Sequence, residues 1–227
     1  MSSDLLYALA AVGGYLLGSI PFGVLVTRFA GVGDVRAIGS GNIGATNVLR
    51  TGRKDLALLT VLGDGGKGLA AVLIARLIAS RLFGPDGVET DWAAAIAGGA
   101  AFFGHLFPVW LRFRGGKGVA TFFGVLLAAA WPVGALAALA WIGVALVFRI
   151  SSLAALTAVA LAPLFALATD ATYPFLLLAV VMGVLVFVRH RANIARLIKG
   201  QEPQMGSGKG GTKAPATRGA EPPASSA

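Results

Sequence analysis

The sequence predicts an all-α, polytopic membrane protein with seven transmembrane helices, and three observations support this fold class. Of its 227 residues, 56% are hydrophobic and only 13% are charged, which is too few to cover the surface of a water-soluble domain. The apolar residues gather in stretches close to the ~20 residues that cross a bilayer as a helix. The basic residues are concentrated between alternate stretches, as topology rules require of a membrane protein.

The first three spans are separated by polar segments. The first is expected at about residues 5–26, where the apolar run includes Gly and Pro residues that packed membrane helices tolerate. The second, at about 56–78, contains Gly-Asp-Gly-Gly-Lys-Gly at 63–68. The third, at about 92–110, has a tryptophan at each end, as is typical of residues at the headgroup level.

The apolar run from 119 to 148 is too long for one span and has Pro132 near its middle. Because proline breaks the interior of a helix, we expect two short spans that meet at this residue. A further pair of apolar runs follows, separated by Thr-Asp-Ala-Thr. The last four spans are therefore expected at about 119–131, 133–148, 153–168 and 174–188.

The charges set the orientation of these spans. Seven spans place 16 of the 19 Lys and Arg residues on one side, in the segments 28–54, 112–117, 149 and 189–227. By the positive-inside rule this side is cytoplasmic, so the N-terminus is expected outside and the C-terminus inside. A single span over 119–148 would divide the basic segments between the two faces.

The chain divides into one domain and a tail. Residues 1–204 are expected to form a single integral-membrane domain. Residues 205–227 consist mainly of Gly, Ser, Pro, Ala and Thr with three basic residues, and offer almost no side chain that a core could bury. This composition predicts a disordered cytoplasmic tail.

The first polar segment that could carry chemistry is residues 36–50. Three glycines free its backbone, and short hydrogen-bonding side chains and a fixed cation are interleaved with them. This combination favours an oxyanion or phosphate cradle over a plain glycine-rich connector. The candidate ligands are Ser40, Asn42, Asn47 and Arg50.

The second segment, residues 113–121, places a glycine turn directly before a helix. Unpaired N–H groups at a helix N-terminus favour an anion, and Lys117 supplies a charge there. The loop is not a nucleoside-triphosphate loop, because Lys117 and Lys67 are followed by glycine and not by Ser or Thr. The alternative is a glycine turn with a lysine reaching toward the headgroups. The candidate residues are Gly115, Gly116, Lys117 and Gly118.

The third segment, residues 189–199, is a basic helix expected at the cytoplasmic end of the last span. His190 and Asn193 share one face at helical spacing, so both side chains can point toward one site. A histidine has the pKa range to accept a proton from a hydroxyl. The alternative is a basic helix that binds lipid headgroups and carries an incidental histidine.

Three ionisable residues fall within the expected spans. Asp64 and Lys67 lie three residues apart on one helical face and can neutralise each other. For these two residues and for His105, in Gly-His-Leu-Phe-Pro, we favour a structural role near the site.

Taken together, these motifs resemble those of the bacterial acyl-phosphate-dependent glycerol-3-phosphate acyltransferases, the PlsY family. The resemblance extends over about residues 5–203. It rests on Gly-Ser-Gly-Asn-Ile-Gly-Ala-Thr-Asn-Val-Leu-Arg at 39–50, Gly-His-Leu-Phe-Pro at 104–108 with Gly-Gly-Lys-Gly-Val-Ala-Thr at 115–121, and Arg-His-Arg at 189–191 with Asn193 and Glu202.

The resemblance implies an enzyme of the bacterial inner membrane with its active site at the cytoplasmic face. It would transfer a fatty acyl group from acyl phosphate to position 1 of glycerol 3-phosphate, giving lysophosphatidic acid and phosphate, the first step of phospholipid synthesis. Carried over by position, it implies functional roles for Ser40, Arg50, His190 and Asn193, a phosphate-binding loop around Lys117, a structural role for Glu202, and a place near the site for Ser152.

Acyl phosphate carries a good leaving group, so this chemistry requires no metal, cofactor or covalent nucleophile. The implied partners are glycerol 3-phosphate, fatty acyl phosphate and membrane lipids, with no nucleic acid and no obligate protein partner. His190 is either the base for the glycerol hydroxyl or a donor to a phosphate, and the acyl phosphate itself could be the base. The alternative function is a small membrane transporter for a phosphorylated or anionic solute, which would also use glycine-broken helices.

Overall fold

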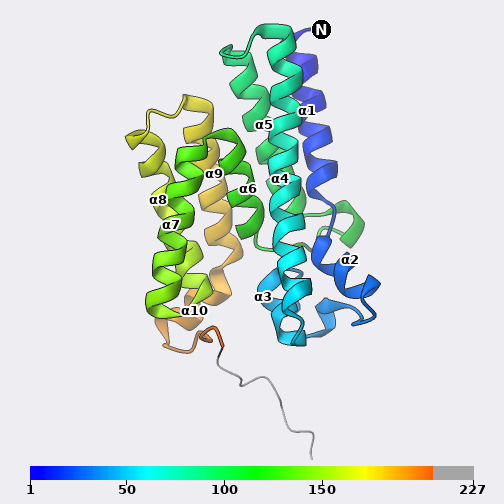
Figure 1. Cartoon of the computed structure of the whole chain (residues 1–227), viewed down its shortest axis with the longest axis vertical. Helices are drawn as coiled ribbons and strands as arrows, with labels where there is room; N and C mark the ends of the chain where they lie inside the picture. The colour runs from blue at the N-terminus through cyan, green and yellow to red at the C-terminus, as the bar shows by residue number, and fades with distance from the viewer. Residues whose placement is uncertain (207–227) are drawn as a thin grey trace, which may run out of the picture.

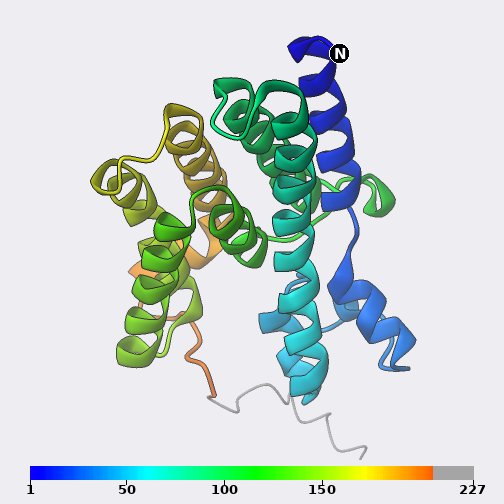
Figure 2. The ribbon, with the colours of Figure 1, turned by 45° about the horizontal axis from the view of Figure 1, so that its top comes forward.

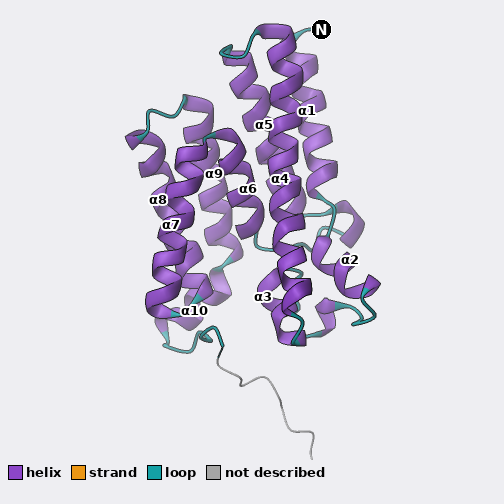
Figure 3. Ribbon diagram, in the orientation of Figure 1, coloured by secondary structure: helices purple, strands orange, loops and turns teal. Residues whose placement is uncertain are grey.

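The computed structural model describes residues 1–206, and these residues contain helices and connecting loops but no strand (Figure 3). The prediction of an all-α protein is thereby confirmed. The longer helices are α1 Ser3–Gly18, α4 Lys54–Phe83, α5 Val88–Leu106, α7 Trp131–Phe148, α8 Ser151–Ala168 and α9 Tyr173–Arg189. The shorter ones are α2 Phe22–Phe29, α3 Ala45–Val48, α6 Val119–Ala129 and α10 Arg191–Ile198, with single 3-10 turns at Val35–Ala37, Leu49–Thr51 and Val109–Leu111.

Several of these helices are long and apolar enough to cross a membrane. Five segments qualify by themselves, and α9 with α10 makes a sixth if this pair, bent by 65°, counts as one broken span. Helix α6 has 11 residues, which cover about 16 Å of a hydrocarbon layer roughly 30 Å thick. Each expected span lies mainly over helix, while the number of crossings stays a prediction.

The first span is broken, unlike the single helix that the sequence suggested. Helix α1 ends at Gly18, and α2 begins at Phe22 after Pro21. Proline lacks an N–H group and would clash with the carbonyl four residues earlier, so the helix stops there. The break frees the carbonyl oxygen of Ile20, which accepts a hydrogen bond of 2.8 Å from Lys67 Nζ on α4.

The expected break at Pro132 is present. Helix α6 ends at Ala129, and Pro132 lies in the first turn of α7, where its missing N–H costs nothing. By contrast, α4 runs without interruption through the glycines at 63–68.

Helices α1 and α5 pack with their backbones in contact. A Cβ atom at Gly14 or Gly18 would overlap the carbonyl oxygen of Ala97 or Ala101 on α5, and one at Gly104 would overlap that of Tyr15 on α1. Only glycine permits this approach, which is a common way for membrane helices to associate. We call this contact the glycine seam.

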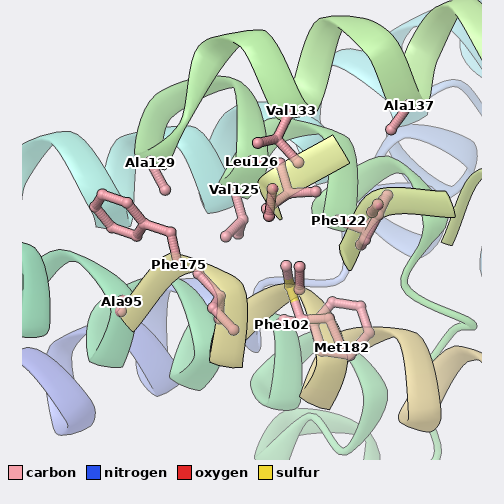
Figure 4. Packing of buried hydrophobic residues seen from close by; sticks show 14 of the residues in the cluster. Ala95, Phe102, Phe122, Val125, Leu126, Ala129, Val133, Ala137, Phe175 and Met182 are labelled. Carbon is pink, nitrogen blue, oxygen red and sulfur yellow. The ribbon is translucent and has the colours of Figure 1, made fainter. Parts of the chain in front are cut away.

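Helices α5 and α6 connect two groups of helices. Helix α5 contacts α1 and α4 on one side and α9 on the other, and α6 contacts α4, α7 and α9. The two groups are visible from both directions in Figures 1 and 2. Phe102, Phe122 and Met182 are fully buried where α5, α6 and α9 meet (Figure 4).

The first and third polar segments lie at one end of the molecule. Figure 1 shows α3 and α10 at the end opposite the N-terminus. At this end Met205 N–H donates to the carbonyl oxygen of Arg149 at 2.6 Å, so the first residue of the expected tail is bound to the domain. Residues 207–227, the rest of that tail, lie outside the described residues.

Candidate active site

Asn47 is the centre of the first polar segment. Its side chain is buried, and its Nδ2 group lies within 2.8–2.9 Å of the carbonyl oxygens of Val35, Ile38 and Asn42. Its Oδ1 atom accepts hydrogen bonds from the N–H and hydroxyl groups of Ser40, at 3.1 and 3.4 Å. Both ends of the amide are therefore occupied in shaping the loop, so Asn47 has no free donor for a phosphate, which differs from its expected role.

Asn42, Ser40 and Arg50 lie on the outer side of the same loop. Asn42 Oδ1 accepts a hydrogen bond of 3.3 Å from Gly44 N–H, just before α3, which leaves its Nδ2 group free. The Arg50 side chain lies against Gly39, where a Cβ atom would overlap it. Arg50 is exposed and makes no hydrogen bond or ion pair within residues 1–206, so its guanidinium is available to an anion.

The glycine loop of the second segment is anchored to the end of α5. Gly115 N–H donates to Leu106 O and Gly116 N–H donates to His105 O, each at 3.1 Å. These two amides are therefore not free to bind a phosphate, which corrects the role expected for them. The N–H groups that remain open are those of Lys117, Gly118 and the first turn of α6.

Gly118 lets the chain turn into α6. Its φ is +88°, in the left-handed region, and a Cβ atom there would overlap the ring of Phe102. A glycine is thus required for both the turn and the packing. The turn directs the N-terminus of α6 and Lys117 toward the third segment.

A hydrogen-bonded network joins the second and third segments. Lys117 Nζ donates to Asn193 Oδ1 at 2.5 Å, and Asn193 Nδ2 donates to Glu202 Oε1 at 2.5 Å. The same Oε1 accepts a bond of 2.7 Å from the Ser152 hydroxyl, and Arg196 Nε donates to Oε2 at 2.6 Å. Glu202 is thus the common acceptor of this network, and Ser152 is one of its donors.

The electrostatics of the network favour an anion beside Lys117. Burial lowers the pKa of the Lys117 ammonium, the positive charges of Arg196, Arg189 and Arg50 lower it further, and Glu202 opposes them. A phosphate bound among these cations would relieve their mutual repulsion. At Glu202 burial acts to raise the pKa, but the hydrogen bonds that it accepts outweigh this and leave the pKa lowered.

His190 lies at the junction of α9 and α10 and is buried. Its Nδ1 atom is 2.8 Å from the carbonyl oxygen of Val186, which can only accept, so Nδ1 carries the proton and Nε2 is a free acceptor. Burial lowers its pKa to about 4, and the charge of nearby Lys117 also lowers it. The imidazole is therefore neutral at pH 7.

Asp64, Lys67 and His105 form a separate buried cluster. Lys67 Nζ is 2.8 Å from Asp64 Oδ1 and 3.0 Å from His105 Nδ1. The His105 ring packs against Gly116, where a Cβ atom would overlap Nε2. The three polar groups are satisfied by one another and by backbone, and His105 connects the cluster to the glycine loop.

A surface cavity of about 620 Å³ brings the first two segments together with α9. Asp34, which lines it, accepts short hydrogen bonds from Arg36, and these hold the pKa of the Asp34 carboxyl well below its usual range. The remaining charged lining is basic. The cavity is lined by Asp34, Arg36, Ala37, Gly41, Phe113, Arg114, Gly115 and Arg189.

Comparison with known proteins identifies the family. A family model described as glycerol-3-phosphate acyltransferase matches residues 8–200. The chain belongs to the glycerol-3-phosphate acyltransferase family. The glycerol-3-phosphate acyltransferase of Caulobacter vibrioides is 62% identical over 207 residues, which cover 91% of each chain. That of Rhodospirillum rubrum is 56% identical over 205 residues, which cover 90% of this chain and 94% of the relative.

Two solved structures from this acyltransferase family are similar in fold. The glycerol 3-phosphate form of PlsY (YgiH), an integral membrane glycerol 3-phosphate acyltransferase, superposes with a TM-score of 0.78 at 40% identity and covers 88% of this chain and 96% of that one. The lysophosphatidic acid form gives 0.76 at 39% identity, with 91% and 96% covered. With the apolar helices, these matches show a multi-pass membrane enzyme and favour an acyltransferase over the alternative transporter.

Sequence reasoning missed two site residues of this acyltransferase, Arg189 and Arg196. Arg189 donates hydrogen bonds to the carbonyl oxygens of Gly115 and Gly116, and Arg196 pairs with Glu202. Neither has an expected role at the site, although Arg189 precedes His190 in the third motif and Arg196 follows Asn193. Among residues 1–206 we find no group of three His, Cys, Asp or Glu side chains suited to a metal ion.

Proposed function

We propose that the chain transfers a fatty acyl group from acyl phosphate to the 1-hydroxyl of glycerol 3-phosphate, giving lysophosphatidic acid and phosphate, at the start of phospholipid synthesis. The observation that carries this proposal is the group of cations around Lys117, which includes Arg50 and Arg189. Residues from the same three acyltransferase motifs also line a largely basic cavity. Glycerol 3-phosphate and lysophosphatidic acid, the molecules named for the two similar structures, both contain phosphate, which this group of cations can bind.

The reaction requires two phosphorylated molecules to be held side by side. The oxygen of the glycerol 1-hydroxyl attacks the acyl carbonyl carbon, and the bond from that carbon to the phosphate oxygen breaks. The phosphate leaves with the electron pair of this bond. Positioning and charge stabilisation supply most of such a rate enhancement, since the leaving group is already good. We assign these tasks to Arg50, to Lys117 and to the open N–H groups at the start of α6.

The hydroxyl proton has two candidate acceptors. His190 Nε2 is free, but a pKa of about 4 makes the imidazole a weak base. The departing phosphate is the stronger base, because even a phosphate monoester takes up its second proton with a pKa of ~6 and the phosphate that leaves carries one more negative charge. We therefore assign His190 to orienting the hydroxyl and the phosphate to taking the proton. Ser40 and Asn42, on the outer side of the first loop, are assigned as further donors to phosphate.

We also propose that the enzyme lies in the bacterial inner membrane with seven crossings, the N-terminus outside and the site at the cytoplasmic face. The distribution of basic residues supports this orientation. The chain has no cysteine, so single cysteines at Lys199 and Asp86 can be labelled with an impermeant maleimide. We expect labelling of position 199 only from the cytoplasmic side and of position 86 only from outside. Labelling of both from one side would contradict the topology.

The activity is tested with purified protein in detergent or lipid, glycerol 3-phosphate, and either acyl phosphate or an acyl thioester as donor. We expect acyl phosphate, and not the thioester, to serve as donor and to give lysophosphatidic acid and phosphate in equal amounts. Arg50→Ala should raise KM for a phosphorylated substrate at least tenfold. Arg53→Ala is the matched control, since Arg53 forms an exposed ion pair with Asp55 in the same segment and such pairs contribute little. Activity with the thioester alone, or with neither donor, would overturn the proposal.

A further inference from the structure

Arg189, the last residue of α9, is bonded to the backbone of the glycine loop. Its Nη2 atom donates to Gly115 O at 2.8 Å, and its Nε atom donates to Gly116 O at 3.1 Å. The guanidinium also lies over the ring of Phe107, 5.5 Å from its centroid. Arg189 is therefore fixed in place by the loop and by the residues that lead into it.

The loop is consequently held on both edges. The N–H groups of Gly115 and Gly116 point to carbonyls at the end of α5, while their C=O groups point to Arg189. The peptide plane between Gly115 and Gly116 is bonded at both its C=O and its N–H group. The plane between Gly116 and Lys117 is bonded at its C=O, so neither plane can rotate without losing a hydrogen bond. These planes lead directly into Lys117, so they set the direction in which that residue leaves the loop.

The junction between α9 and α10 also holds the side chain of Lys117. Its ammonium donates to Asn193, which lies four residues after Arg189 along the chain. Lys117 is thus attached to this helical junction through its backbone by way of Arg189 and through its side chain by way of Asn193.

We propose that Arg189 is a positioning residue, which orients Lys117 and the start of α6 toward the bound phosphate by clamping the carbonyls of Gly115 and Gly116. This inference rests on the proposed function in assigning a phosphate to Lys117. The clamp needs a planar guanidinium, because Nε and Nη2 reach two neighbouring carbonyls at once and a lysine ammonium is a single point of charge.

The test compares Arg189→Lys and Arg189→Ala with Arg191→Ala as the matched control. Arg191 lies on the other side of His190, is exposed, and makes no hydrogen bond or ion pair in the part of the chain that the structure describes. We expect both Arg189 variants to lose about 100-fold in kcat/KM, the size of loss that a small misplacement of a binding group causes. The unfolding temperature should stay near that of the wild type, and Arg191→Ala should keep wild-type kinetics.

Two further readouts separate positioning from a general structural role. In a double-mutant cycle, Arg189→Ala should add little to the loss caused by Lys117→Ala, because it acts through that residue. Ethylguanidinium added to Arg189→Ala should restore part of the activity, and ethylammonium should not. Additive losses, full activity of Arg189→Lys, or a loss that follows only the unfolded fraction would each overturn the inference.

The clamp can also be observed without any turnover. Hydrogen exchange of the amides of residues 115–118 should be faster in Arg189→Ala than in the wild type or in Arg191→Ala. Unchanged exchange there would refute the clamp even if the enzyme is active. An inactive wild type with faster exchange in the variant would instead overturn the proposed function and keep the clamp.

Discussion

Asn47→Asp offers the most direct test of how the first polar segment is built. The substitution changes only the amide nitrogen to oxygen, so the side chain keeps its size. In the wild type this nitrogen lies 2.9, 2.9 and 2.8 Å from three carbonyl oxygens, those of Val35, Ile38 and Asn42. In the variant an acceptor would face three acceptors, while Oδ1 would still accept from Ser40.

The expected cost follows from these contacts. Each hydrogen bond contributes about 1 kcal/mol net, so the loss of the two N–H donors that the three carbonyls share costs about 2 kcal/mol, and repulsion between the new oxygen and these carbonyls brings the total to about 3 kcal/mol. If the segment unfolds with the rest of the domain, this corresponds to about 6–12 °C in the unfolding temperature for a chain of this size. If it opens locally, the amides of residues 35–48 should exchange with solvent up to about 100-fold faster.

Asn42→Asp is the matched control, because the Asn42 side chain uses only its oxygen, to accept from Gly44 N–H. The same chemical change should leave folding and exchange near the wild type. The assays are thermal unfolding in detergent and hydrogen exchange followed by mass spectrometry. Equal behaviour of the two variants in both assays would refute the assignment of Asn47 as the residue that shapes the loop.

Two other predictions concern the glycine loop and the network behind it. Gly116→Ala should lower the stability by about 1–3 kcal/mol and abolish most of the activity, because the new methyl group overlaps the buried ring of His105. Gly143→Ala is the control, since the space around Gly143 is open, and it should change neither stability nor activity. Unfolding and activity assays on both variants check this. Glu202→Gln should cost about 1–2 kcal/mol at pH 7 through weakened hydrogen bonds. Because the folded pKa of Glu202 is lowered, its contribution is present above the unfolded pKa of ~4.3 and is lost as the pH falls through the folded pKa. Unfolding temperatures from pH 7 to pH 3 should therefore converge for wild type and Glu202→Gln, and a constant difference would contradict this account.

Most of the fold could be predicted from local features of the sequence. Apolar runs of suitable length marked the longer helices, and Pro132 marked the boundary between α6 and α7, because both signals depend only on neighbouring residues. The break between α1 and α2 was missed although Pro21 was visible. The freed carbonyl of Ile20 is satisfied by Lys67, 47 residues away, and no local pattern reveals such a partner.

The site was predicted in outline for the same reason. The motifs named the segments that meet, since residue types with phosphate chemistry cluster in each of them. What the sequence could not show is which polar groups are already used within the protein. The amides of Gly115 and Gly116 are occupied by the end of α5, and that of Asn47 by its own loop, so their roles depend on contacts that form only in the folded chain.

The glycine seam between α1 and α5 has a consequence for motion. Backbones that touch at Gly14, Gly18 and Gly104 leave no side chain that could change rotamer, and no room for one helix to slide past the other. This half of the molecule therefore behaves as a stiff frame. Any opening that admits a substrate or releases a product is therefore expected between the glycine loop and α10, where the hydrogen bond from Lys117 to Asn193 is one that a passing phosphate can exchange.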